Sequence, residues 1–123
     1  MRYLFPLLAG FIVYLASSFN ITDGYVEMIK KKVPGYERHI TGNFAPMWEP
    51  MASQMVSEYN LESGIALDIG SSTSPFLIEL ARITDMHCYA VDIDPWAMRL
   101  MGVFVDEADL TGRVIPVEGD WQD

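Results

Sequence analysis

The second half of the chain alternates short apolar runs with helix-forming stretches, and this pattern limits the fold more than any other feature. Three five-residue runs are rich in apolar side chains: Ile65–Ile69, Tyr89–Ile93 and Arg113–Val117. Such runs are typical of strands buried in a parallel sheet. The stretches between them begin at Ser74 and Asp94, each followed by a proline, as helices often do. We therefore predict the order strand, helix, strand, helix, strand.

That order forms the mononucleotide-binding half of a doubly wound sheet. We expect an α/β fold, a Rossmann-like doubly wound parallel sheet preceded by N-terminal helices. The chain divides into an apolar segment at 1–20, a helical lead-in at 21–63 and a partial cofactor-binding domain at 64–123.

The lead-in has its own helical pattern. We predict a helix from about Tyr25 to Val33, a loop at 34–46 and a second helix over Met47–Tyr59. One face of the second helix repeats large side chains every four residues, which favours a face packed in the core. These are Met47, Met51, Met55 and Tyr59, with Trp48 and Ala52 beside them.

Residues 3–19 contain no charged side chain over 17 positions, close to the ~17 residues that a short membrane span needs. Three interpretations stay open: a membrane anchor, a signal peptide that starts at Arg2, and a buried helix of a soluble domain. If the segment is an anchor, the basic cluster Lys30–Lys32 favours a cytosolic location for the rest of the chain. The expected location is membrane-anchored with a cytosolic domain, or cytoplasmic.

Charge and cysteine content exclude some functions. The chain has 8 Lys and Arg against 17 Asp and Glu, a formal net charge of -9. A surface this acidic repels phosphate backbones, so we expect no nucleic-acid partner. The single cysteine, Cys88, is expected to be a small buried side chain, and no Cys/His spacing suggests a metal site.

Ligands of doubly wound sheets bind beyond the carboxyl ends of the strands. The first such end carries Asp68 and Gly70. The glycine permits a sharp turn, and a carboxylate in an apolar strand needs a cationic or hydrogen-bonding partner. The second carries Asp92, 22 positions after Gly70, where an acidic residue typically accepts hydrogen bonds from ribose hydroxyls. At the third, Asp120 is placed to bind an exocyclic amino group and Trp121 to pack on a base.

These three ends resemble the class I S-adenosylmethionine-dependent methyltransferases over residues 64–123. That family has an acid-x-Gly-x-Gly-x-Gly loop after the first strand, an acid after the second and a Gly-Asp after the third, where this chain has Gly119-Asp120. The resemblance implies S-adenosylmethionine as cofactor and a small-molecule methyl acceptor, with catalytic residues unknown. The cofactor-binding residues that it implies are Asp68, Gly70, Ser71, Ser72, Asp92, Ile93, Asp120 and Trp121.

The chain departs from the family in two respects. Ser72 and Ser74 replace the second and third glycines of the loop. A left-handed backbone at either one costs about 1–2 kcal/mol, which would weaken ligand binding roughly tenfold. The pattern also supplies only three strands of the roughly seven in such a sheet. We expect a truncated methyltransferase that is inactive by itself.

Two other functions stay open. One is a dinucleotide-binding domain of an oxidoreductase, although the loop Gly70–Pro75 fails the G-x-G-x-x-G pattern at two positions. The other is a non-enzymatic interaction module with a degenerate pocket, in contact with a membrane through residues 3–19.

Overall fold

The computed structural model describes residues 23–120 and 122. The expected apolar segment at 1–20 and Trp121 lie outside the described residues. Among the described residues, no helix is long and apolar enough to cross a membrane. The elements are α2 (Asp23–Lys32), α3 (Glu37–Ile40), the 3-10 helix η1 (Ala45–Met47), α4 (Trp48–Tyr59), β1 (Ser63–Ile69), α5 (Phe76–Ile83), β2 (Asp85–Asp92), α6 (Pro95–Glu107) and β3 (Val114–Glu118).

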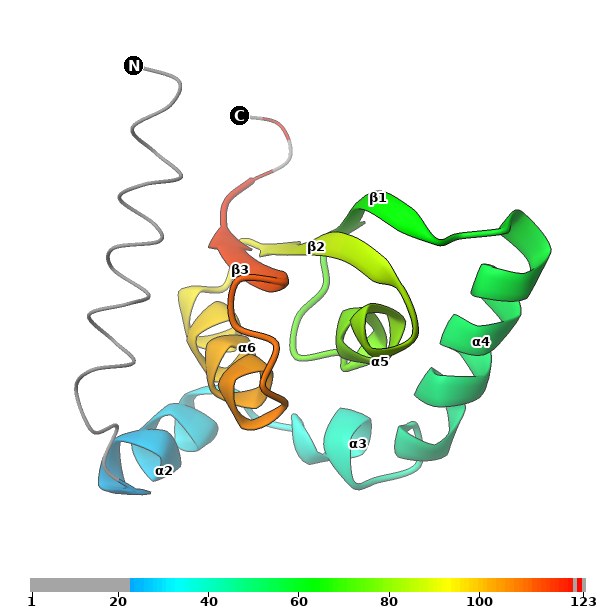
Figure 1. The fold of residues 1–123 in the computed structure, drawn as a ribbon. Helices are drawn as coiled ribbons and strands as arrows, with labels where there is room; N and C mark the ends of the chain where they lie inside the picture. The colour runs from blue at the N-terminus through cyan, green and yellow to red at the C-terminus, as the bar shows by residue number, and fades with distance from the viewer. Residues whose placement is uncertain (1–22, 121, 123) are drawn as a thin grey trace, which may run out of the picture.

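The strands form one parallel sheet in the order β1-β2-β3 (Figure 1). Leu67 pairs with Tyr89, which in turn pairs with Ile115, so corresponding positions of the strands lie side by side. The carboxyl ends of all three strands therefore meet at one edge. This arrangement confirms the predicted α/β, Rossmann-like fold class.

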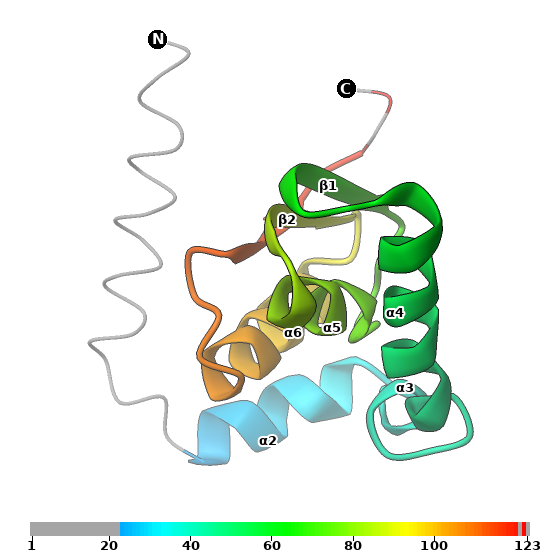
Figure 2. The same ribbon diagram turned by 45° about the vertical axis from the view of Figure 1, so that its right-hand side comes forward.

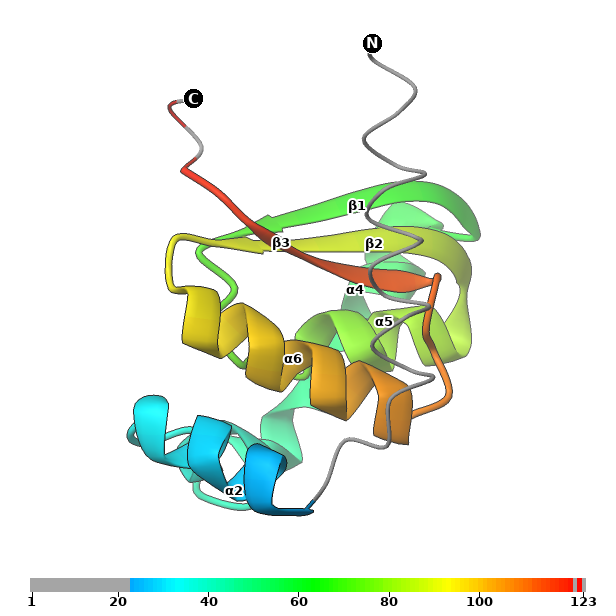
Figure 3. The ribbon, with the colours of Figure 1, turned by 90° about the vertical axis from the view of Figure 1, so that its left-hand side faces the viewer.

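Helices α5 and α6 pack on one face of the sheet, and the core lies between them and the strands (Figure 3). From the sheet this core takes Cys88, Ala90 and Val114, each at most 1% exposed. The predicted burial of Cys88 is thus confirmed. Ile65 and Leu67 point to the opposite face and are 74% and 60% exposed. No described helix covers that face.

The middle strand is longer than its apolar run predicts, because β2 starts at Asp85 instead of Tyr89. Over its first residues, buried Met86 and Cys88 alternate with exposed Asp85 and His87. The sequence therefore shows alternation there instead of an apolar run, as expected for a strand with only one covered face.

Arg113 ties the amino end of β3 to the helical layer. Its guanidinium Nη2 donates to the carbonyl oxygens of Ala81 at 3.2 Å, Thr84 at 2.8 Å and Met86 at 2.9 Å. The segment that closes α5 and opens β2 is thereby fixed against the third strand.

The lead-in helices pack on the outside of the helical layer (Figure 2). Helix α4 contacts α5, and α2 contacts α6. The loop expected at 34–46 contains the short helices α3 and η1, and the Trp48 indole N–H donates to the carbonyl of His39 at 2.8 Å. In the predicted core face, Ala52 is buried and Met51 and Met55 are half-buried. The prediction is wrong at the two ends, since Tyr59 is exposed and so is Met47, which lies in η1.

Candidate functional site

The carboxyl ends of the three strands surround a cavity of about 520 Å³. It contains four of the predicted site residues, namely Gly70, Asp92, Ile93 and Asp120, and these come from all three strand ends. Ile69, Val91, Gly119 and Gln122 complete the lining. Asp68, Ser71 and Ser72 lie in β1 or the loop that follows it without lining this cavity.

The loop after β1 is held against the end of β2 by backbone hydrogen bonds. The amides of Gly70 and Ser71 both donate to the carbonyl of Val91, at 2.8 and 3.1 Å. Gly70 has φ +76° and Ser72 has φ +48°. The left-handed conformation considered for the loop serines therefore occurs at Ser72, and Ser74 does not adopt it. Side chains at Ser71 and Thr73 are buried, so the loop is a packed part of the structure.

The Asp92 carboxylate accepts one backbone amide on each oxygen. Ser72 N–H donates to Oδ2 at 2.8 Å and Asp94 N–H donates to Oδ1 at 2.9 Å. Asp94 in turn accepts from the amide of Trp96 at 2.9 Å and caps α6, as the sequence predicts. The cap leaves Asp92 as the carboxylate that faces both the loop and the cavity.

Asp68 is partly buried and lies on the helix-covered side of β1, between exposed Leu67 and Ile69. Burial raises the pKa of its carboxyl above the usual range, and the nearby charge of Asp92 raises it further. Within the described residues, no hydrogen-bond partner of this carboxylate is found. A cation beside Asp68 would favour the charged form of its carboxyl.

The side chains that line the cavity fit a cationic nucleoside better than a phosphorylated one. Asp92 and Asp120 supply acceptor oxygens, and no lysine or arginine is among the described lining residues. Ile69, Val91 and Ile93 supply apolar surface, and Ile93 is 70% exposed. A pyrophosphate would meet like charge here, whereas hydroxyls and an amino group would meet hydrogen-bond acceptors and a sulfonium would meet negative charge.

Sequence reasoning missed Ile69, Val91 and Gln122 as lining residues. Ile69 and Val91 are paired neighbours at the ends of their strands, so the rule that ligands sit beyond strand ends would have included both. Gln122 follows a Gly-Asp turn in which its amide donates to Asp120 Oδ1 at 3.0 Å. No local signal marks Gln122.

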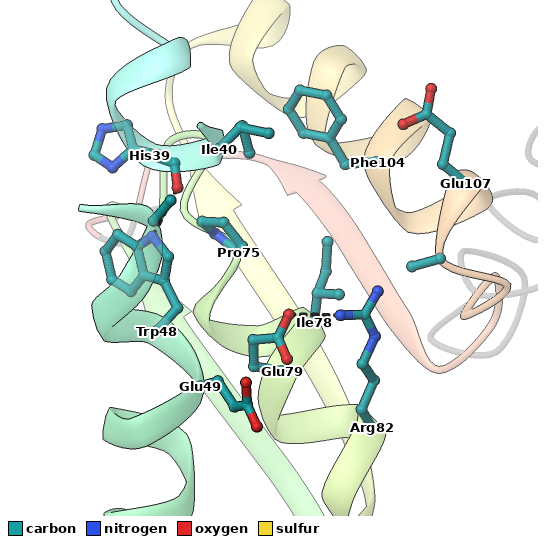
Figure 4. A pocket seen from close by; sticks show the side chains of 12 residues that line it. His39, Ile40, Trp48, Glu49, Pro75, Ile78, Glu79, Arg82, Phe104 and Glu107 are labelled. Atoms are coloured by element: carbon teal, nitrogen blue, oxygen red, sulfur yellow. Dashed lines mark hydrogen bonds and ion pairs between the residues drawn. The ribbon is translucent and has the colours of Figure 1, made fainter. Parts of the chain in front are cut away.

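A second hollow, of about 320 Å³, lies between part of the lead-in and the helical layer (Figure 4). Trp48 and His39 lie at one end of it, and Glu79 pairs with Arg82 at 2.6 Å near the other. It lies on the helical side and shares no lining residue with the cavity at the strand ends.

No family model and no curated protein matches the sequence. Solved structures do match it. A Methanococcus maripaludis protein, provisionally described as an S-adenosyl-L-methionine-dependent methyltransferase, is 21% identical with a TM-score of 0.63 over 81% of this chain and 42% of that one. An O-methyltransferase from Bacillus cereus in complex with S-adenosylhomocysteine is 14% identical with a TM-score of 0.51, over 85% and 47%. This chain has the fold of these methyltransferases. It spans less than half the length of either.

Proposed function

We propose that this chain is the cofactor-binding portion of an S-adenosylmethionine-dependent methyltransferase with a small-molecule acceptor. The observation that carries the proposal is the convergence of Gly70, Asp92, Ile93 and Asp120 on one cavity at the carboxyl edge of a parallel sheet. The shared fold supports it, as does the absence of basic side chains from the described lining.

Each residue has a proposed role in holding the cofactor. Asp92 accepts hydrogen bonds from ribose hydroxyls, and Ile93 packs against the adenine. Asp120 accepts a hydrogen bond from the exocyclic amino group of the base. Asp68 lies on the side where the cationic methionine part is expected. Burial and the charge of Asp92 raise the pKa of its carboxyl. Gly70 and Ser71 border that part, and Trp121 packs beside the base.

The cofactor would supply an electrophilic methyl group. The protein would hold the methyl group and the acceptor in the geometry for reaction, which can lower the barrier substantially. None of the site residues is assigned as a general base. The chain spans less than half of each of the two methyltransferases it matches. Methyl transfer is therefore proposed for a whole enzyme, and the role proposed for this chain is cofactor binding.

Calorimetric titration of the full chain tests this function. We expect S-adenosylhomocysteine to bind with a dissociation constant on the order of micromolar and NADH not to bind. Asp120→Ala should weaken binding about tenfold, because it removes one hydrogen-bond acceptor for the base. The matched control is Asp85→Ala, which should leave affinity unchanged. Asp85 lies at the amino end of β2, at the opposite edge of the sheet from the cavity. Binding of NADH without binding of S-adenosylhomocysteine would reverse the assignment in favour of an oxidoreductase domain.

We also propose that residues 3–19 contact a membrane, since they form an uncharged apolar stretch of 17 residues. Flotation with vesicles of neutral phospholipid should carry the full chain upward and leave a chain lacking residues 1–22 at the bottom. Equal behaviour of the two chains would remove the membrane from the proposal.

A further inference from the structure

The Asp92 carboxylate joins two loops that come from different strands. One oxygen binds the amide of Ser72, in the loop after β1, at 2.8 Å, and the other binds the amide of Asp94, in the turn into α6, at 2.9 Å. Within the described residues, Asp92 is the one side chain outside the loop that binds an amide of residues 70–74. The amides of Gly70 and Ser71 bind the carbonyl of Val91, so Asp92 adds the side-chain contact that holds the next residue, Ser72.

The residue that it holds has a strained backbone. Three described non-glycine residues have positive φ: Asn60, Ser72 and Asp109. Asparagine and aspartate tolerate the left-handed region well, whereas serine does so less readily. Asn60 and Asp109 follow helix ends, where such a conformation is common. Ser72 instead lies in the loop after β1, away from a helix end, and has a strained backbone in that loop.

We infer that Asp92 is a positioning residue that keeps Ser72 in the left-handed conformation and so shapes the loop before any ligand arrives. An amide donated to an ionised carboxylate is among the stronger protein hydrogen bonds, which suits it to offset backbone strain. A serine can therefore stand where the related loops have glycine. This inference rests on the proposed function, because it treats residues 70–74 as the cofactor loop.

Positioning and ribose binding are compatible in one carboxylate. Each carboxylate oxygen has two lone-pair sites, and the backbone amides of Ser72 and Asp94 occupy one on each oxygen. One site on each oxygen remains for a ribose hydroxyl. Removing the carboxylate would therefore affect affinity twice: directly at the ribose and indirectly through the loop.

A double-mutant cycle separates the two effects. S-adenosylhomocysteine is titrated into the full chain and into the variants Asp92→Ala, Ser72→Gly and the double variant. We expect Asp92→Ala to weaken binding at least tenfold in the native background and several-fold less when residue 72 is glycine, which adopts positive φ without strain. An equal factor in both backgrounds would mean that Asp92 acts only by touching the ligand, and the inference would be wrong.

The matched control is Ser72→Ala. It removes the same hydroxyl as Ser72→Gly but keeps a Cβ, so the backbone strain at φ +48° remains. In the Ser72→Ala background, Asp92→Ala should cost the full factor that it costs in the native chain. If alanine relieves the loss as glycine does, the hydroxyl is responsible and the backbone explanation is overturned.

Amide hydrogen exchange of the ligand-free chain, followed by NMR, tests the inference without any ligand. We expect the Ser72 amide to exchange at least tenfold faster in Asp92→Ala, with Leu100 in α6 unchanged as an internal reference. In Asp92→Asn, which keeps one acceptor oxygen, the Ser72 exchange rate should lie between those of the native chain and Asp92→Ala. This variant replaces Asp92→Ala if the alanine variant does not fold. Unchanged protection at Ser72 in Asp92→Asn or Asp92→Ala would refute the inference.

The ligand titration and the hydrogen-exchange measurement test the proposed function and the positioning role of Asp92 independently. If the native chain binds no S-adenosylhomocysteine, the proposed function is lost, whereas faster Ser72 exchange in the variants still supports the loop role of Asp92. If the native chain binds and the Ser72 amide keeps its protection in the variants, the function stands and the positioning role is lost.

Discussion

The two faces of the sheet differ in how much of their apolar surface is covered. Cys88, Ala90 and Val114 point toward α5 and α6 and are almost wholly buried, whereas Ile65, Leu67 and Ile69 on the other face are more than half exposed. Parallel sheets are normally covered on both faces. The covered face holds the strand ends in register, and the candidate site lies at the edge of that ordered layer.

The difference shows how a three-stranded sheet with one covered face can position a site at its edge. Pro116, in β3, has no N–H to donate to a further strand, which suits β3 to an outer edge. On the opposite side, the edge of β1 pairs with no other strand among the described residues. The cavity residues come from all three strand ends, and all three are fixed by the covered face. If this is right, substitutions on the two faces should have unequal effects.

The largest contrast is expected between two leucines. Leu100 in α6 is fully buried, whereas Leu67 on β1 is 60% exposed. Leu100→Ala should lower the free energy of unfolding by about 2–5 kcal/mol, since it leaves a cavity in the core. Leu67→Ala should lower it by less than about 1 kcal/mol. Urea unfolding followed by circular dichroism measures both, and equal losses would show that the two faces are equally packed.

Arg113 should give the next largest effect, because it ties α5 to the strands on the covered side. Arg113→Met keeps the apolar stem and removes the donors to three carbonyls. We expect a loss of about 2–3 kcal/mol in unfolding free energy. Arg82→Met, which removes the ion pair of an exposed side chain to Glu79, should cost less than about 1 kcal/mol. Similar losses for both arginines would contradict the structural role of Arg113.

A smaller effect, with a defined pH dependence, is expected at Asp68. Its folded-state pKa is raised, first by burial and then by the charge of Asp92, so the neutral acid is favoured more in the folded protein than in the unfolded chain. The stability associated with this neutral form is present at acid pH and is lost as pH rises through the folded-state pKa. Asp68→Asn imitates the neutral acid. Thermal unfolding should show equal stability near pH 3 and a more stable variant near pH 7; a less stable variant at neutral pH would contradict this assignment.

The smallest single effect is expected at Val117, which forms the most closely matched comparison with Val114 on the same strand, β3. Val117 faces the open side and is 37% exposed, whereas Val114 faces the core and is 1% exposed. Val117→Thr should change the unfolding free energy by no more than about 0.5 kcal/mol. Val114→Thr, which buries a hydroxyl, should cost about 1–3 kcal/mol. The same chemical denaturation measures both, and a costly Val117→Thr would mean that the open face is packed.

The sequence predicted the strand and helix order because its signals are local. Five-residue apolar runs and the Asp94-Pro95 helix start depend on near neighbours, and the structure contains both. The core face predicted for Met47–Tyr59 was wrong at its two ends because tertiary contacts decide how far along a helix the burial extends: Ala52 packs inward, whereas Met47 and Tyr59 stay exposed.

In the candidate site, too, one part could be predicted from the sequence and another could not. Spacing along the chain placed Gly70, Asp92 and Asp120 at one edge, since strand ends of a parallel sheet share an edge, and the structure has all three around one cavity. Spacing does not show how a carboxylate uses its lone pairs. The bond from Ser72 N–H to Asp92 therefore emerges only from the three-dimensional structure.

The most direct test of the central claim is an NMR titration of the isotopically labelled chain with S-adenosylhomocysteine. The claim is that a nucleoside ligand binds at the carboxyl edge of the covered sheet. It predicts that the amide signals of Gly70, Ser72, Asp92, Ile93 and Asp120 shift with one common dissociation constant, while those of Arg82 and Glu107, beside the second hollow, stay in place. Shifts confined to the second hollow or to the open face, or no shifts at all, would contradict it.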